Sequence, residues 1–214
     1  MSGLPAYFWE RRGEIAALTG QHLVLVGIST ALAVAVGLPL GVALSRRPRL
    51  ARPILGIASV VQTIPSLALF GFLIPLPLIG GIGARTAVAA LLLYALLPIL
   101  RNTYAGITSV DPATVEAAVG LGMTPRQRLR SVELPLALPV VLAGIRIAAV
   151  VSIGLATIAA AVGAGGLGVL IYRGIAIVDT RLILAGAVPA ALLALAVDGL
   201  LGVLERRGSA WRSP

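Results

Sequence analysis

Residues 22–44 read HLVLVGISTALAVAVGLPLGVAL, a run without a charged side chain that decides the fold class. A helix needs about 20 apolar residues to cross the hydrocarbon core of a bilayer, and this run is long enough. Four further apolar runs follow at residues 53–74, 86–100, 138–162 and 182–204. The sequence therefore predicts an all-α, polytopic membrane protein with five transmembrane helices.

The composition agrees with a position in the membrane. Of the 214 residues, 58% are hydrophobic and 12% are charged, about half the charged fraction of a typical soluble domain. Aromatic residues make up 4%, too few for the aromatic girdles of a membrane β-barrel. The chain has no cysteine and one histidine, so no metal site is predicted. All 17 basic residues are arginine, which excludes the lysine-dependent phosphate-binding loop of an ATPase.

Arginine counting predicts the orientation, because cytoplasmic loops carry the excess of positive charge. With the N-terminus outside, the inner segments hold eleven arginines and the outer segments five. The inner ones are Arg46, Arg47, Arg49, Arg52, Arg101, Arg126, Arg128, Arg130, Arg206, Arg207 and Arg212, and the outer ones are Arg11, Arg12, Arg85, Arg173 and Arg181. We therefore expect the N-terminus outside and the C-terminus in the cytoplasm. The net charge of +9 is attributed to these loops, and no nucleic-acid partner is expected.

The most informative segment is DPATVEAAVGLGMTPRQRLRSVELP, residues 111–135, between the third and fourth spans. Residues 111–112 pair an N-cap aspartate with a proline at the first helical position, and the glycines within 120–122 end that helix. Residues 124–127 form the capping box of a second helix. The loop predicts two short helices on the cytoplasmic face. Capping alone fits an ordinary surface loop equally well.

The same segment resembles the EAA motif of ABC importer permeases. The matching residues are Glu116, Ala117, Ala118 and Gly122, followed after nine residues by Val132, Leu134 and Pro135. The resemblance implies that residues 111–135, the coupling loop, dock into a groove on a separate ATPase subunit. The implied coupling residues are Glu116, Ala117, Ala118, Gly122, Thr124, Pro125, Leu134 and Pro135.

Two further stretches narrow the resemblance. Residues 62–69, QTIPSLAL, and residues 144–168, from GIR to the glycine-rich GAGGLG, are similar to permeases for quaternary-ammonium osmoprotectants such as glycine betaine, choline and carnitine. The likeness covers about residues 21–204. It implies a type I importer fold like that of methionine importers, in the bacterial cytoplasmic membrane and in contact with its lipid. Methionine or another small solute is an alternative substrate.

The resemblance also implies partners. These are two ATP-binding subunits, a second permease subunit that is expected to be identical, and an extracytoplasmic substrate-binding protein. ATP and Mg would be bound by the ATPase, and this chain would bind no cofactor and perform no bond chemistry. The expected divisions are an interfacial segment (1–21), a permease domain (22–204) and a cytoplasmic tail (205–214). An autonomous channel or carrier is a remote alternative, and an intramembrane enzyme lacks a nucleophile–base pair.

Polar residues inside the predicted spans are candidates for the translocation path or its gate. They are Gln62, Thr63, Pro65 and Ser66 in the second span and Tyr94 in the third. A proline in a span frees a backbone carbonyl that must be satisfied inside the protein. Packing between helices explains the same residues equally well, since Ser and Thr commonly join membrane helices.

One charged residue lies inside each of the last two predicted spans, and a histidine begins the first span. Arg146 and Asp198 are expected to pair and to hold the fourth span against the fifth, because charges inside a membrane pair or face water. Contact with the substrate is the alternative. His22 is expected to be solvated or to cap a helix at the outer mouth.

Overall fold

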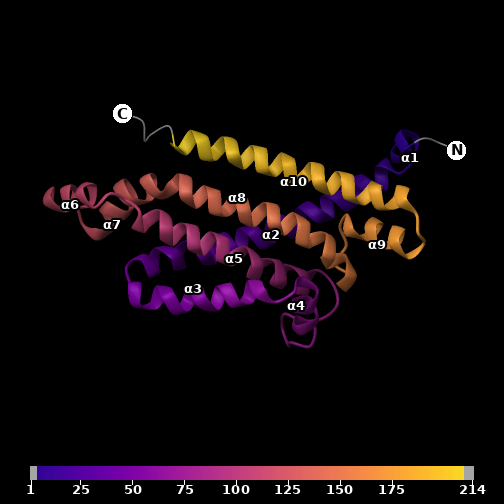
Figure 1. Ribbon diagram of the computed structural model, residues 1–214, viewed down its shortest axis with the longest axis horizontal. Helices are drawn as coiled ribbons and strands as arrows, with labels where there is room; N and C mark the ends of the chain where they lie inside the picture. Colours follow the sequence, from indigo (N-terminus) through magenta and orange to yellow (C-terminus); the bar gives the residue numbers. More distant parts are fainter. Residues whose placement is uncertain (1–3, 210–214) are drawn as a thin grey trace.

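The computed structural model describes residues 4–209, and every regular element in this range is a helix (Figure 1). Residues 1–3 of the predicted interfacial segment and residues 210–214 of the predicted tail, with Arg212, lie outside the described range. The elements are α1 (Leu4–Glu10), α2 (Arg12–Ser45), α3 (Pro48–Thr63), α4 (Ser66–Leu73), α5 (Ala84–Thr108), α6 (Pro112–Gly120), α7 (Pro125–Arg128), the π-helical turn η1 (Leu129–Glu133), α8 (Leu134–Ala159), the 3₁₀ turn η2 (Ala160–Val162), α9 (Gly168–Ala176) and α10 (Thr180–Ser209).

Four helical stretches in this range are long and apolar enough to cross a membrane: α2, α5, Pro125–Val162 and α10. The pair α3 and α4 makes a fifth if it is counted as one span. The predicted all-α polytopic fold is therefore confirmed. Two helices cross the predicted segment boundaries, because α2 begins inside residues 1–21 and α10 continues into residues 205–214. The limits of the membrane stay a prediction.

The second span is not the continuous helix that the apolar run 53–74 predicts. Helices α3 and α4 meet at an angle of 101°. The break falls at Ile64, whose φ of −68° and ψ of 127° are extended, and at Pro65, which precedes the first turn of α4. A proline lacks a backbone N–H and disfavours the helical conformation of the residue before it. Length and hydropathy predicted the span, and this proline explains its bend.

Helix α5 lies at the centre of the bundle and packs against α2, α8, α3 and α4. Phe70, Leu91 and Ile153 contribute large, fully buried side chains to the main core cluster. Where the helices approach most closely, glycine replaces the larger residues. A Cβ atom at Gly144 would lie 2.5 Å from Cβ of Asn102, so α5 and α8 could not cross as they do with any other residue there.

The expectation that His22 is solvated is wrong. Its side chain is 0% exposed, and Nε2 donates to the carbonyl oxygen of Ile153 on α8 at 3.0 Å. Helix α2 starts ten residues before His22, so the ring lies inside the bundle instead of at a helix end. The glycine turn after η2 packs close to this site: Gly166 has a φ of +76°, and its N–H donates to Oε1 of Gln21 at 3.2 Å.

The two ends of the bundle differ in charge. The α2–α3 connection, helices α6 and α7 and the C-terminal end of α10 lie at one end (Figure 1). Helices α1 and α9 lie at the other (Figure 1). Arg46, Arg47, Arg126, Arg128 and Arg207 all belong to the first end. The sequence predicts that this arginine-rich end faces the cytoplasm.

Candidate functional site

The first helix of the coupling loop, α6, is capped at both ends. Oδ1 of Asp111 accepts the backbone N–H of Ala113 at 3.1 Å, which confirms the predicted N-cap. At the other end the N–H of Met123 donates to the carbonyl of Ala118 at 3.1 Å, and that of Gly122 to Val119 at 2.9 Å. This is the Schellman arrangement, and it requires a left-handed residue, here Gly122 with a φ of +78°. These bonds make α6 a defined surface element.

The second helix is also capped as predicted, but it does not stand alone. Oγ1 of Thr124 accepts the N–H of Gln127, while Oε1 of Gln127 accepts the N–H of Thr124 at 2.9 Å. Helix α7 then continues through the π turn η1 into α8 without a loop. The sequence predicted a short helix separate from the fourth span. The observed helix joins the coupling loop directly to that span.

The exposed surface of the coupling loop differs in part from the predicted one. Glu116, Ala117, Gly122, Thr124, Pro125 and Pro135 are exposed, and Leu134 is half-buried. Ala118 is buried and cannot contribute to an outer docking surface, because α6 packs on η1 and α7. Val119 and Leu121 are instead large apolar side chains in contact with solvent. Sequence reasoning missed these two. Val119 lies about 100° around α6 from Ala118, and Leu121 is the C-cap residue that follows the helix.

The break between α3 and α4 is held by Tyr94 of α5. Its hydroxyl donates to the carbonyl of Ile64, and its own carbonyl accepts Nε2 of Gln62 at 2.9 Å. The carbonyl of Ile64 is one that the break leaves without its helical partner. The structure therefore brings together two of the predicted path residues, Gln62 and Tyr94, around the bend.

The other predicted path residues are placed differently. Thr63 is exposed and donates to the carbonyl of Val60 in its own helix at 2.7 Å. Pro65 is exposed at the bend, and the half-buried Ser66 begins α4. The polar residues predicted for the second span are therefore divided between two helices, because the 101° bend turns α4 away from the axis of α3.

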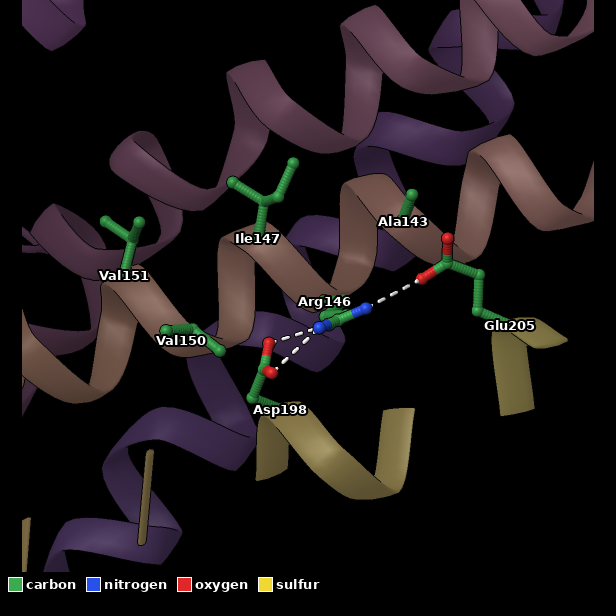
Figure 2. Close-up of a pocket in the computed structure, with 7 residues that line it drawn as sticks. All are labelled: Ala143, Arg146, Ile147, Val150, Val151, Asp198 and Glu205. Carbon is green, nitrogen blue, oxygen red and sulfur yellow. Dashed lines mark hydrogen bonds and ion pairs between the residues drawn. The ribbon is translucent and has the colours of Figure 1, made fainter. Parts of the chain in front are cut away.

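Arg146 and Asp198 form a two-bond ion pair between α8 and α10 (Figure 2). Nε donates to Oδ1 at 2.6 Å and Nη2 to Oδ2 at 2.8 Å. A third group, Glu205, accepts from Nη1 at 3.2 Å. Gly202 lies beneath the guanidinium, since a Cβ atom there would be 3.1 Å from Nη1. The cluster therefore ties the two helices together.

Glu205 was missed because the sequence assigned it to the tail. Its position was readable: Asp198 and Glu205 are seven residues apart, two helical turns on one face. The side chains of Arg146 and Asp198 remain 34% and 40% exposed, beside a cavity of about 320 Å³. Aliphatic side chains of α8 line the rest of it: Ala143, Ile147, Val150 and Val151 (Figure 2). Because charges in a membrane avoid lipid, this flank faces water or another chain.

The described residues form a bundle of apolar helices with a broken span, an ion cluster between spans and a capped helix pair at one end, features that suit a membrane transport protein. A family model described as the binding-protein-dependent transport system inner membrane component matches residues 33–209. The chain belongs to this family.

Known relatives extend over nearly the whole chain. The chain is 51% identical over 201 residues to the osmoprotectant import permease protein OsmW of Salmonella typhimurium, covering 93% of this chain and 94% of the relative. It is 42% identical over 207 residues to the glycine betaine/carnitine/choline transport system permease protein OpuCB of Bacillus subtilis, covering 97% and 94%.

A solved structure shares the fold. The MetNI methionine ABC transporter in an inward-facing conformation superposes with a TM-score of 0.83 at 25% identity, covering 97% of this chain and 99% of that one. A second crystal form of the same transporter gives 0.80 at 26% identity. The fold is therefore that of type I ABC importer permeases.

Proposed function

We propose that this chain is the membrane-spanning permease subunit of an ABC importer that carries quaternary-ammonium osmoprotectants across the bacterial cytoplasmic membrane. The observation that carries the proposal is the identity of 42–51% to permeases named for these solutes, which extends through the coupling loop and every span. The fold neighbours named for methionine are only 25–26% identical, so methionine is the weaker candidate.

The chain works with partners that supply what it lacks. A separate ATP-binding subunit, present in two copies, binds ATP and Mg and performs the hydrolysis. A second, identical permease chain completes the passage, and an extracytoplasmic binding protein delivers the solute. The role of this chain is to bind these partners and to move. It binds no cofactor and makes or breaks no covalent bond.

The coupling loop receives the movement of the ATPase. The exposed Glu116, Val119 and Leu121 on and beside α6 offer one carboxylate and two apolar side chains to a groove on that subunit. Because α7 continues into α8, displacement of the loop tilts the fourth span and shifts the passage between outward-open and inward-open states. The bend at Pro65, held by Tyr94, is the proposed gate.

Uptake into proteoliposomes tests the substrate class. The complete transporter is reconstituted into vesicles together with its binding protein, and ATP is supplied either inside or outside the vesicles. Radiolabelled glycine betaine, choline, carnitine and methionine are then supplied in turn. We expect ATP-dependent uptake of at least one quaternary-ammonium solute that persists when an ionophore collapses the ion gradients. Uptake of methionine alone, or uptake that needs an ion gradient and no ATP, would refute the proposal.

A pair of substitutions at Gly122 tests the role of the coupling loop. No neighbouring atom limits a side chain there, so the left-handed φ of +78° is the sole obstacle to substitution. Asn tolerates this conformation and Val does not. We expect Gly122→Val to lower the uptake of solute for each ATP hydrolysed and Gly122→Asn to preserve it. Equal uptake by the two variants would count against the role of this turn.

A further inference from the structure

Glu133 is the one acidic side chain among residues 4–209 that is buried, with 2% exposed. It is the last residue of η1, at the point where the coupling loop becomes α8. A carboxylate that is removed from water is costly unless it is paired and hydrogen-bonded. Glu133 therefore needs hydrogen-bonding partners of opposite charge at this junction, and two arginines provide them.

Both oxygens of the Glu133 carboxylate are occupied. Oε1 accepts Nη1 of Arg46 at 3.0 Å and Nε of Arg128 at 2.9 Å. Oε2 accepts Nη2 of Arg46. The contact with Arg46 is therefore the two-bond arrangement that fixes both position and orientation. We call Arg46, Arg128 and Glu133 the carboxylate clamp.

The carboxylate clamp joins elements that are far apart in the sequence. Arg46 is the C-cap residue of α2, whereas Arg128 ends α7 and Glu133 ends η1. Arg46 and Glu133 are 87 positions apart in the sequence. The clamp therefore connects the arginine-rich end of the first span to the helix that leads from the coupling loop into the fourth.

The backbone at this junction is specialised as well. The N–H of Leu134 bonds to the carbonyl of Leu129, five residues back, which is the wide turn of a π helix. Such turns are rare and occur often at functional sites, because the extra residue rotates the side chains that follow. Here the turn brings the side chain of Glu133 to the inside of the bundle.

Helix α6 does not fill the space next to the clamp. A cavity of about 310 Å³ is lined by Pro112, Val115 and Glu116 of α6 on one side and by Arg46 and Glu133 on the other. Helix α6 itself packs on α7 and η1. A displacement of α6 is therefore transmitted to α7 and η1. The carboxylate clamp in turn connects these two elements directly to α2.

We propose that the carboxylate clamp makes the coupling loop and the inner end of α2 move as one body, with Glu133 as the positioning residue. The inference rests on the proposed function as a permease driven by a separate ATPase. Without the charge on Glu133, the loop and α8 can follow the ATPase while α2 stays behind. Hydrolysis then continues, but fewer solute molecules are moved for each ATP.

The test compares Glu133→Gln with the unaltered chain in the reconstituted complete transporter. Solute uptake and ATP hydrolysis are measured in the same proteoliposomes, with the unaltered chain defining the solute. We expect the ratio of uptake to hydrolysis to fall about fivefold or more, at the lower end of usual coupling energies. The KM for the solute stays unchanged. The matched control is Glu10→Gln, an exposed carboxylate at the other end of the bundle.

The ratio of solute uptake to ATP hydrolysis distinguishes a loss of coupling from a loss of folding. A variant that merely folds poorly loses uptake and hydrolysis in parallel, so an unchanged ratio overturns the role of the clamp. If Glu133→Gln does not assemble, Arg46→Ala replaces it, with the adjacent exposed Arg47→Ala as control. A fall in the ratio for Arg46→Ala alone supports the clamp, and equal ratios overturn it. An unaltered chain without ATP-dependent uptake refutes the proposed function instead.

Discussion

Tyr94 shows how a single side chain stabilises a bent membrane span. Its hydroxyl donates to the carbonyl of Ile64, at the centre of the bend, and its own carbonyl accepts from Gln62, on the α3 side. In a membrane, the carbonyls that a bend frees have no water to bind, so an internal donor is needed. A phenol supplies that donor and also packs its ring into the core cluster around Phe70 and Leu91.

Tyr94→Phe removes the hydroxyl and keeps the ring. The loss of one hydrogen bond lowers the local stability of the bend by about 1 kcal/mol, which corresponds to roughly fivefold faster opening. We expect the hydrogen-bonded amides of α4, which begin with that of Leu69, to exchange hydrogen faster by that factor, as measured by mass spectrometry. The control is Tyr104→Phe on the same helix, whose ring belongs to a different cluster. Equal exchange in the two variants would show that Tyr94 does not hold the bend.

Single residues were predictable where the membrane limits their partners. The sequence pairs Arg146 with Asp198 because few charges are available inside the spans, and the structure brings the two together. Glu133 and His22 were not predictable, because their burial depends on where helices cross and on the π turn. No periodic pattern in one sequence reports such crossings.

At the scale of elements, the helix ends were more readable than the helix bends. Asp111 and Thr124 cap α6 and α7 as local chemistry predicts, since a cap depends on residues within one turn. The run 53–74 had the hydropathy of one span. Pro65 explains why that span bends, but a proline alone does not report an angle as large as 101°. The continuity of α7 with α8 was also unpredictable, because Pro135 signals the start of a new helix, whereas the π turn η1 leads directly into α8.

The crossing of α5 and α8 gives a matched pair of substitutions. Gly144→Ala and Gly154→Ala lie on the same helix and gain the same helix propensity, about 1 kcal/mol. At Gly154 no atom lies within 4 Å of the added carbon, whereas at Gly144 it meets Asn102 and the carbonyl of Pro98 at 2.5 and 2.8 Å.

Overpacking of this kind costs about 1–3 kcal/mol. We therefore expect Gly144→Ala to lower the unfolding temperature in detergent and Gly154→Ala to leave it unchanged or to raise it. Equal shifts for the two variants would show that the crossing relaxes without cost.

For the whole molecule, the separation of charge between the two ends predicts its orientation in the membrane. The chain has no cysteine, so single-cysteine variants can be labelled without background. Arg47→Cys and Ile177→Cys place thiols at exposed positions of opposite ends. With a membrane-impermeant reagent on intact cells, we expect labelling at position 177, and labelling at position 47 only after permeabilisation. The reverse pattern would invert the predicted topology and remove the coupling loop from the cytoplasm.

The unbroken course of residues Pro125–Val162 has a geometric consequence for the whole transporter. These 38 residues make a rod of about 57 Å at 1.5 Å per residue, longer than the bilayer core is thick. A stiff rod that pivots near its middle swings its two tips in opposite directions. In the proposed importer, movement of one end toward the molecular axis would therefore carry the other end outward, so the same helix would close the passage on one side of the membrane as it opens the passage on the other.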